Sequence, residues 1–164
     1  MNITTKNLTL TAVFAALTFI VTRFIQIPIP LGYFNVGNSV ILLSCLLVPS
    51  PYGILIGSIG SALADLTSYP VYTIPTLIIK ALMPLIFYKL QNVKLFKFSF
   101  RIPAAAIATL VPLFGYTLTG GIIYGSFYTG LAQFPGLFLE YVANLVIFSL
   151  LLVPVTKMTS TLKA

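Results

Sequence analysis

Apolar residues fill most of the chain in six runs, which short stretches rich in proline, glycine or basic residues separate. The runs lack the strict alternation of apolar and polar positions that is typical of a membrane β-barrel, so they favour helices. They predict helices at about 7–26, 38–48, 52–67, 72–90, 102–126 and 135–158. The longer runs reach the roughly 20 apolar residues that a helix needs to cross a bilayer. We therefore expect an all-α integral membrane bundle of six transmembrane helices, in one domain spanning residues 1–164.

Composition supports this class of protein. The chain is 59% hydrophobic and only 7% charged, whereas a soluble domain carries about 25% charged residues. The first apolar run is expected to be retained as a helix that stops before Pro28 and Pro30. A signal peptide is the alternative, but no small-x-small cleavage site follows the run and Arg23 interrupts its end. Cys45 lies in an apolar run and is expected to pack in the core.

Basic residues gather in three regions, at the start, between the fourth and fifth predicted helices, and at the end. They are Lys6, Lys94, Lys97, Arg101, Lys157 and Lys163. Six helices would place these regions on one side of the membrane, and basic loops favour the cytoplasm. We therefore expect both termini to be cytoplasmic. The net charge of +7 is explained by this topology and predicts no nucleic-acid partner.

Hydrogen-bonding side chains within the apolar runs gather in the half of the bundle that this topology places outside. We predict that they bind substrate: Asn38, Thr76, Lys80, Tyr116, Tyr124, Glu140, Tyr141 and Asn144. Small-molecule sites are typically apolar and aromatic pockets with a few converging polar groups. The pattern therefore predicts a pocket that opens to the outside. Asn144 has an alternative role, a structural hydrogen bond between helices.

Two charged residues inside the apolar runs need a partner, because a charge costs several kcal/mol in a bilayer core. Asp65 continues the row Gly53, Gly57 and Ser61 on a face suited to close helix packing. Asp65 and Lys80 are expected either to form a structural ion pair or to contact substrate. Arg23 and Glu140 are candidates for a second ion pair, with snorkelling of Arg23 as the alternative.

Signatures of catalysis are missing from the sequence. It has no histidine, no Cys/His cluster and no phosphate-binding loop, and its two acidic residues argue against a metal site. We expect no enzyme activity, no bound cofactor and no ATP hydrolysis by this chain. Uphill transport would then need a partner or an ion gradient. A stand-alone secondary transporter, or a small channel that oligomerises through its glycine faces, is the alternative to a partner-driven carrier.

Four segments resemble one known family: Asn35-x-Gly37, Pro51-x-Gly53, Gly57-x-x-Gly60-Ser61-Ala62-Leu63-Ala64-Asp65 and Tyr72-x-x-Pro75-Thr76-Leu77-Ile78-Ile79-Lys80. The chain is similar over nearly its whole length to the S component, the membrane-embedded substrate-binding subunit of energy-coupling factor (ECF) vitamin transporters. It looks closest to the branch with riboflavin, pyridoxine and hydroxymethylpyrimidine carriers.

The resemblance implies a multi-pass protein of a prokaryotic cytoplasmic membrane, surrounded by lipid. It also implies a transmembrane coupling (T) subunit and two ATPase (A) subunits as partners, with ATP hydrolysed only by the latter. Ala12 and Ala16 match an Ala-x-x-x-Ala motif that contacts the coupling subunit in the family. Packing of these alanines inside the chain is the alternative.

The implied ligand is a small water-soluble vitamin or vitamin precursor. The chain departs from its relatives in having Asn38 where they often have Asp and Ser50 where they often have Gly, and the first change removes a charge beside the expected pocket. Glu140 and Asn144 suit a small heterocycle with amine and hydroxyl groups. We therefore expect a pyridoxine-like or hydroxymethylpyrimidine-like compound ahead of riboflavin.

Overall fold

The computed structural model describes residues 4–29, 32–91 and 100–161. Pro30, which the prediction of the first helix used, and Lys94, Lys97 and Lys163, which the topology prediction used, lie outside the described residues. The described residues form six α-helices, one short hairpin and one 3-10 turn. In chain order they are α1 (Thr5–Phe24), β1 (Ile27–Ile29), β2 (Gly32–Phe34), α2 (Gly37–Ser44), α3 (Tyr52–Ser68), η1 (Pro70–Tyr72), α4 (Thr73–Gln91), α5 (Arg101–Ile123) and α6 (Phe127–Thr161).

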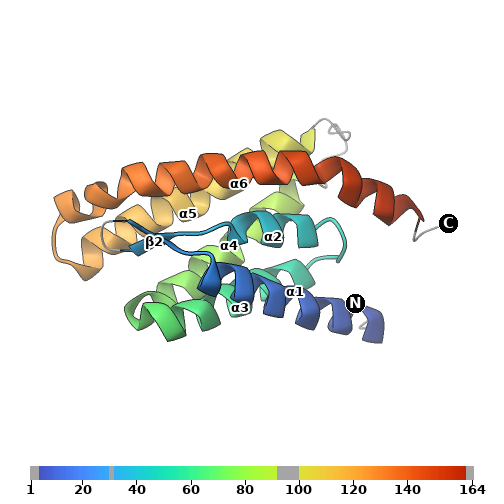
Figure 1. Ribbon diagram of the computed structural model, residues 1–164, viewed down its shortest axis with the longest axis horizontal. Helices are drawn as coiled ribbons and strands as arrows, with labels where there is room; N and C mark the ends of the chain where they lie inside the picture. The colour runs from blue at the N-terminus through green and yellow to red at the C-terminus, as the bar shows by residue number, and fades with distance from the viewer. Residues whose placement is uncertain (1–3, 30–31, 92–99, 162–164) are drawn as a thin grey trace.

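The predicted six-helix bundle is confirmed. Four segments of the described chain are long and apolar enough to cross a membrane, namely α1, η1 with α4, α5, and α6. Helix α2 has only 8 residues and α3 has 17. Figure 1 shows that α1 begins and α6 ends at the same end of the bundle, as an even number of helices requires. Which end faces the cytoplasm stays a prediction.

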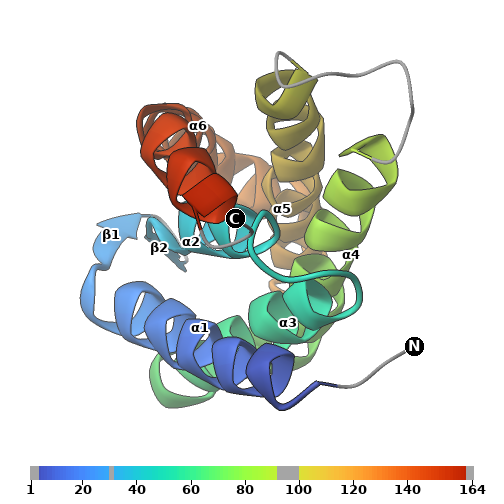
Figure 2. The same ribbon diagram turned by 90° about the vertical axis from the view of Figure 1, so that its right-hand side faces the viewer.

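The short helix α2 lies inside the bundle. Seen along the long axis, α1, α3, α4, α5 and α6 surround it (Figure 2). All its residues except Val40 are buried. Around this centre α1 packs on α3, α3 on α4, α4 on α5, and α5 on α6, while α6 also packs on α2. The interior of the bundle is therefore occupied by a helix that is too short to span the membrane by itself.

An apolar core fills the end of the bundle away from the hairpin. It includes Ile41 and Leu42 of α2, Phe87 of α4 and Phe148 of α6, each 0% exposed. The rings of Phe87 and Phe148 meet edge to face, with centroids 5.8 Å apart. Cys45 is a free thiol in the same core. Polar side chains are thereby left to gather at the other end.

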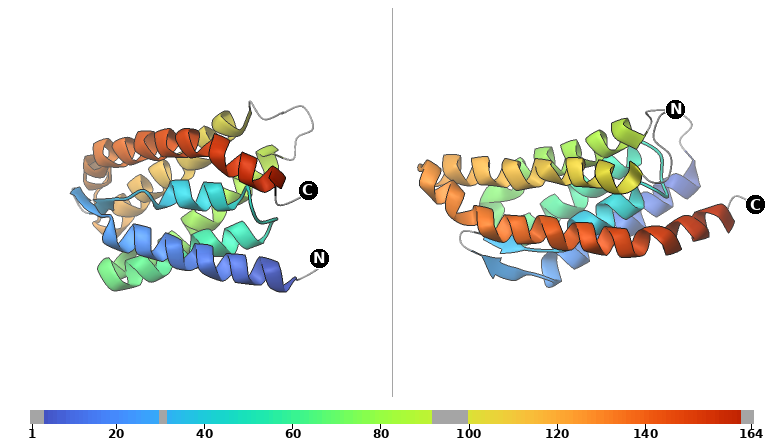
Figure 3. Two further views of the ribbon diagram at one scale, coloured as in Figure 1. Left: turned by 45° about the vertical axis from the view of Figure 1, so that its right-hand side comes forward. Right: turned by 90° about the horizontal axis from the view of Figure 1, so that it is seen from above.

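The loop after α1 folds into a hairpin, which the sequence analysis did not predict. Strands β1 and β2 pair antiparallel, with Ile27 opposite Phe34 and Ile29 opposite Gly32. The hairpin lies beside α6 (Figure 3). A Cβ added to Gly136 of α6 would lie 2.7 Å from Ile29 Cγ2, so the two elements are in direct contact.

Helix α6 begins eight residues before the predicted start at Pro135 (135 − 127 = 8), so the predicted loop 127–134 is wrong. Gly125 ends the preceding turn with a positive φ of 68°, a conformation that glycine adopts without steric cost. The carbonyl of Ser126 then accepts from the amide of Gly130 at 3.3 Å. The helix therefore restarts at Phe127, and Pro135 lies inside it.

Close packing of α5 on α6 depends on Gly130. A Cβ at this position would lie 2.4 Å from the Thr117 carbonyl oxygen and 2.8 Å from the Gly121 amide nitrogen, both backbone atoms. Gly130→Ala should therefore force the helices apart and destabilise the chain by about 1–3 kcal/mol. Thermal unfolding in detergent measures this. Gly121→Ala is the matched control, because its nearest new contact is 3.6 Å. Equal melting temperatures for the two variants would contradict the prediction.

Candidate binding site

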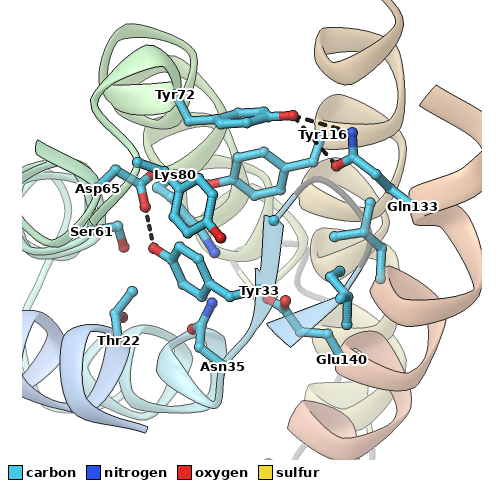
Figure 4. A pocket seen from close by; sticks show the side chains of 14 residues that line it. Thr22, Tyr33, Asn35, Ser61, Asp65, Tyr72, Lys80, Tyr116, Gln133 and Glu140 are labelled. Atoms are coloured by element: carbon cyan, nitrogen blue, oxygen red, sulfur yellow. Dashed lines mark hydrogen bonds between the residues drawn. The ribbon is translucent and has the colours of Figure 1, made fainter. Parts of the chain in front are cut away.

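A pocket with about 450 Å³ of empty space lies at the hairpin end of the bundle (Figure 4). Residues from α1, the hairpin, α3, η1, α4, α5 and α6 line it. They are Thr22, Ile29, Gly32, Tyr33, Asn35, Ser61, Asp65, Tyr69, Tyr72, Lys80, Tyr116, Gln133, Leu137 and Glu140. The wall thus combines four tyrosines with charged, amide and hydroxyl groups, as expected for a small-molecule site.

The Asp65 carboxylate ties the hairpin to three helices. It accepts hydrogen bonds from the hydroxyls of Tyr33 in β2 and Thr76 in α4. The Thr76 hydroxyl oxygen also lies 2.9 Å from the hydroxyl oxygen of Tyr116 in α5. Burial, and secondly the neighbouring Asp65 carboxylate, raise the pKa of Tyr33 above its ordinary value, so this phenol remains a donor. The Tyr33 ring further packs on Tyr69, with centroids 5.5 Å apart.

Asn38 bridges the two charged residues on the other side of the pocket. Lys80 Nζ donates to Asn38 Oδ1, and Asn38 Nδ2 donates to Glu140 Oε1 at 2.9 Å. All three residues are at most 3% exposed. Lys80 Nζ also lies 5.3 Å from the centroid of the Tyr116 ring, a distance that allows a cation–π interaction. An amide therefore separates the lysine from the glutamate.

Neither predicted ion pair is a direct contact in the described part of the chain. The hydrogen bonds of Asp65 come from two hydroxyls, and Lys80 donates to the neutral Asn38. Arg23 lies partly exposed, with its guanidinium carbon 5.8 Å from the centroid of the Phe24 ring. Neutral side chains thus hydrogen-bond to Asp65, Lys80 and Glu140, and Asn38 bridges the last two.

The predicted binding residues divide into two groups. Lys80, Tyr116 and Glu140 line the main pocket. Asn38 and Tyr141 line a smaller pocket of about 180 Å³, which shares Tyr116 and Glu140 with the main one. These five residues come from α2, α4, α5 and α6, so the structure does bring together side chains that lie far apart in the sequence.

The other three predicted binding residues do not line the main pocket. Thr76 is 0% exposed and lies behind the wall, where it holds Asp65. Asn144 accepts from the Ser39 amide at 2.8 Å and donates to the Asn35 carbonyl at 2.8 Å. Its alternative role, a structural hydrogen bond between elements, is therefore what the structure shows. Tyr124 lies at the end of α5 and is 40% exposed.

Sequence reasoning missed several residues that line the pocket, and Gln133 is the clearest case. It is 2% exposed, and its Nε2 donates to the Tyr72 hydroxyl at 3.1 Å. Because 127–134 was predicted as a loop, Gln133 was not read as part of a helix. With the true start of α6, Gln133, Leu137 and Glu140 form one row at helical spacing.

Comparison with known proteins adds two findings. The family model described as "ECF-type riboflavin transporter, S component" matches residues 2–157 of the chain. A relative described as "Uncharacterized protein in gap 3'region", from Pyrococcus woesei, is 41% identical over 63 residues. That match covers 37% of this chain and 43% of the relative, so the chain spans less than half the length of that protein.

Proposed function

Because the chain belongs to the S-component family of ECF-type riboflavin transporters, we propose that it captures a small water-soluble vitamin or vitamin precursor for an ATP-driven importer. The chain is a multi-pass membrane protein. The observation that carries the proposal is the polar and aromatic pocket at the hairpin end. A membrane coupling subunit and two ATPase subunits would use the energy of ATP to release the substrate inside the cell.

The lining of the pocket supports a compact nitrogen heterocycle with hydroxyl groups. Lys80, Gln133 and Glu140 offer donors and acceptors for ring nitrogens and an amine. A pyridoxine-like or hydroxymethylpyrimidine-like substrate is therefore proposed ahead of riboflavin.

Riboflavin is the second candidate, and the description of the family favours it. Four tyrosines line the pocket, namely Tyr33, Tyr69, Tyr72 and Tyr116. Aromatic side chains pack against flat rings of any size.

Calorimetric titration of the purified chain, without partners, tests the proposal. Pyridoxine, hydroxymethylpyrimidine and riboflavin are the probes, and we expect saturable binding of one of them with one site per chain. Quenching of riboflavin's own fluorescence gives an independent signal for that ligand. Failure of all three probes to bind would contradict the proposal. Uptake by the chain alone in vesicles, without ATP or partners, would favour the secondary transporter instead.

A further inference from the structure

Two hydroxyl groups on one side of the pocket have no hydrogen-bond partner among the residues that the structure describes. They belong to Thr22 in the last turn of α1 and Ser61 in α3. Thr22 is 2% exposed and Ser61 is 1% exposed, so bulk water does not reach either oxygen. Both residues line the pocket, and Figure 4 shows them across from Gln133 and Glu140.

Several other buried hydroxyls in the helices donate to a carbonyl of the preceding turn, although those of Thr18, Tyr52 and Thr73 do not. Ser58 donates to the Ile54 carbonyl at 2.8 Å, and Thr117 donates to the Leu113 carbonyl at 2.8 Å. This bond to the preceding turn is the usual solution for serine and threonine inside a helix. Thr22 and Ser61 do not make it. An unpaired buried hydroxyl is unfavourable. A polar ligand that hydrogen-bonds to these two hydroxyls would remove that cost, which would strengthen its binding.

We propose that Thr22 and Ser61 form a subsite that binds a hydroxyl group of the substrate, an inference that rests on the proposed function. Each side-chain hydroxyl can donate one hydrogen bond and accept up to two, so the pair can bind one substrate hydroxyl as donor and acceptor together. Gln133 and Glu140 face them across the pocket. The substrate would therefore carry a hydroxyl-bearing arm on one side and its ring nitrogens or amine on the other.

Thr22→Val and Ser61→Ala test the subsite, with whichever of pyridoxine, hydroxymethylpyrimidine and riboflavin binds the wild-type chain most tightly. Each variant should weaken binding about 2- to 12-fold, the equivalent of one neutral hydrogen bond. The free variants should melt at the same or a higher temperature than the wild type, because an apolar group replaces an unpaired hydroxyl. A purely structural role for these hydroxyls would not combine weaker binding with unchanged or higher stability.

Thr18→Val is the matched control. Thr18 lies one turn before Thr22 in α1, is 0% exposed and also has an unpaired hydroxyl, but it does not line the pocket. Its substitution should leave affinity unchanged. As a second control, Thr22→Val should have no effect on a deoxy analogue of the same ligand, in which methyl replaces hydroxymethyl or the ribityl chain is missing.

Two results would overturn the subsite alone: unchanged affinity in both Thr22→Val and Ser61→Ala, or an equal loss in Thr18→Val. A wild-type chain that binds none of the three probes would overturn the proposed function and the subsite with it. Reading the wild-type titration first therefore distinguishes the two failures.

Discussion

Asn38→Leu should destabilise the folded chain by about 3–5 kcal/mol, the usual effect of leaving a buried charge without its partner. The amide is 2% exposed and serves two charged groups at once. Its oxygen accepts from Lys80, and its nitrogen donates to Glu140. Leucine has a similar size but offers neither contact. Thermal or denaturant unfolding of the purified variant in detergent measures the loss.

A charge-shifted double variant provides the control for Asn38→Leu. Asn38→Asp together with Glu140→Gln keeps the net charge, since one carboxylate replaces another. The new carboxylate can accept from Lys80, and the new amide can donate to that carboxylate. We expect most of the lost stability to return. Asn38→Asp alone brings two carboxylates together and should be less stable than the double variant. Wild-type stability in Asn38→Leu would show that the bridge contributes nothing.

The bundle could be predicted from the sequence because its membrane-spanning helices appear there as long apolar runs. The start of α6 could not. The segment from Phe127 to Phe134 contains Thr129 and Gln133, and proline is common in the first turn of helices, so Pro135 looked like the beginning. Gly125, which has a positive φ, ends the preceding turn just before this segment, and the helix begins after it. That angle is a property of the folded turn.

Only part of the site could be predicted, because some of its contacts join segments that are distant in the sequence. Lys80, Tyr116 and Glu140 are conspicuous as polar residues in apolar runs. Their similar depth along the predicted helices indicated that they lie in one pocket. Tyr33 meets Asp65 from 32 positions away through a hairpin that has no strong strand pattern. The bridging role of Asn38 likewise depends on three helices meeting at one point. Contacts of this kind arise only when the helices pack.

Substituting both Ala12 and Ala16 with tryptophan should abolish ATP-driven uptake while leaving substrate binding by the isolated chain intact. Both alanines lie on the exposed face of α1, whereas Thr18 and Thr22 face the interior. In lipid, helices associate through close van der Waals contact, so small side chains allow a partner helix to approach. Two indole rings would keep the coupling subunit away. Uptake in vesicles that contain all subunits, beside calorimetry on the chain alone, measures the two effects.

Two single variants control for added bulk and for packing inside the chain. Leu118→Trp adds a large ring on α5, where Leu118 is 59% exposed and the helix lies across the bundle from α1 in Figure 2. Uptake should survive that change. Ala15→Leu instead enlarges the side of α1 that meets α3, because a Cβ on Gly60 would lie 2.7 Å from the Ala15 carbonyl oxygen. That variant should melt early. Normal uptake in the double tryptophan variant would remove this face of α1 from the interface, and loss of binding by its isolated chain would assign the alanines to internal packing.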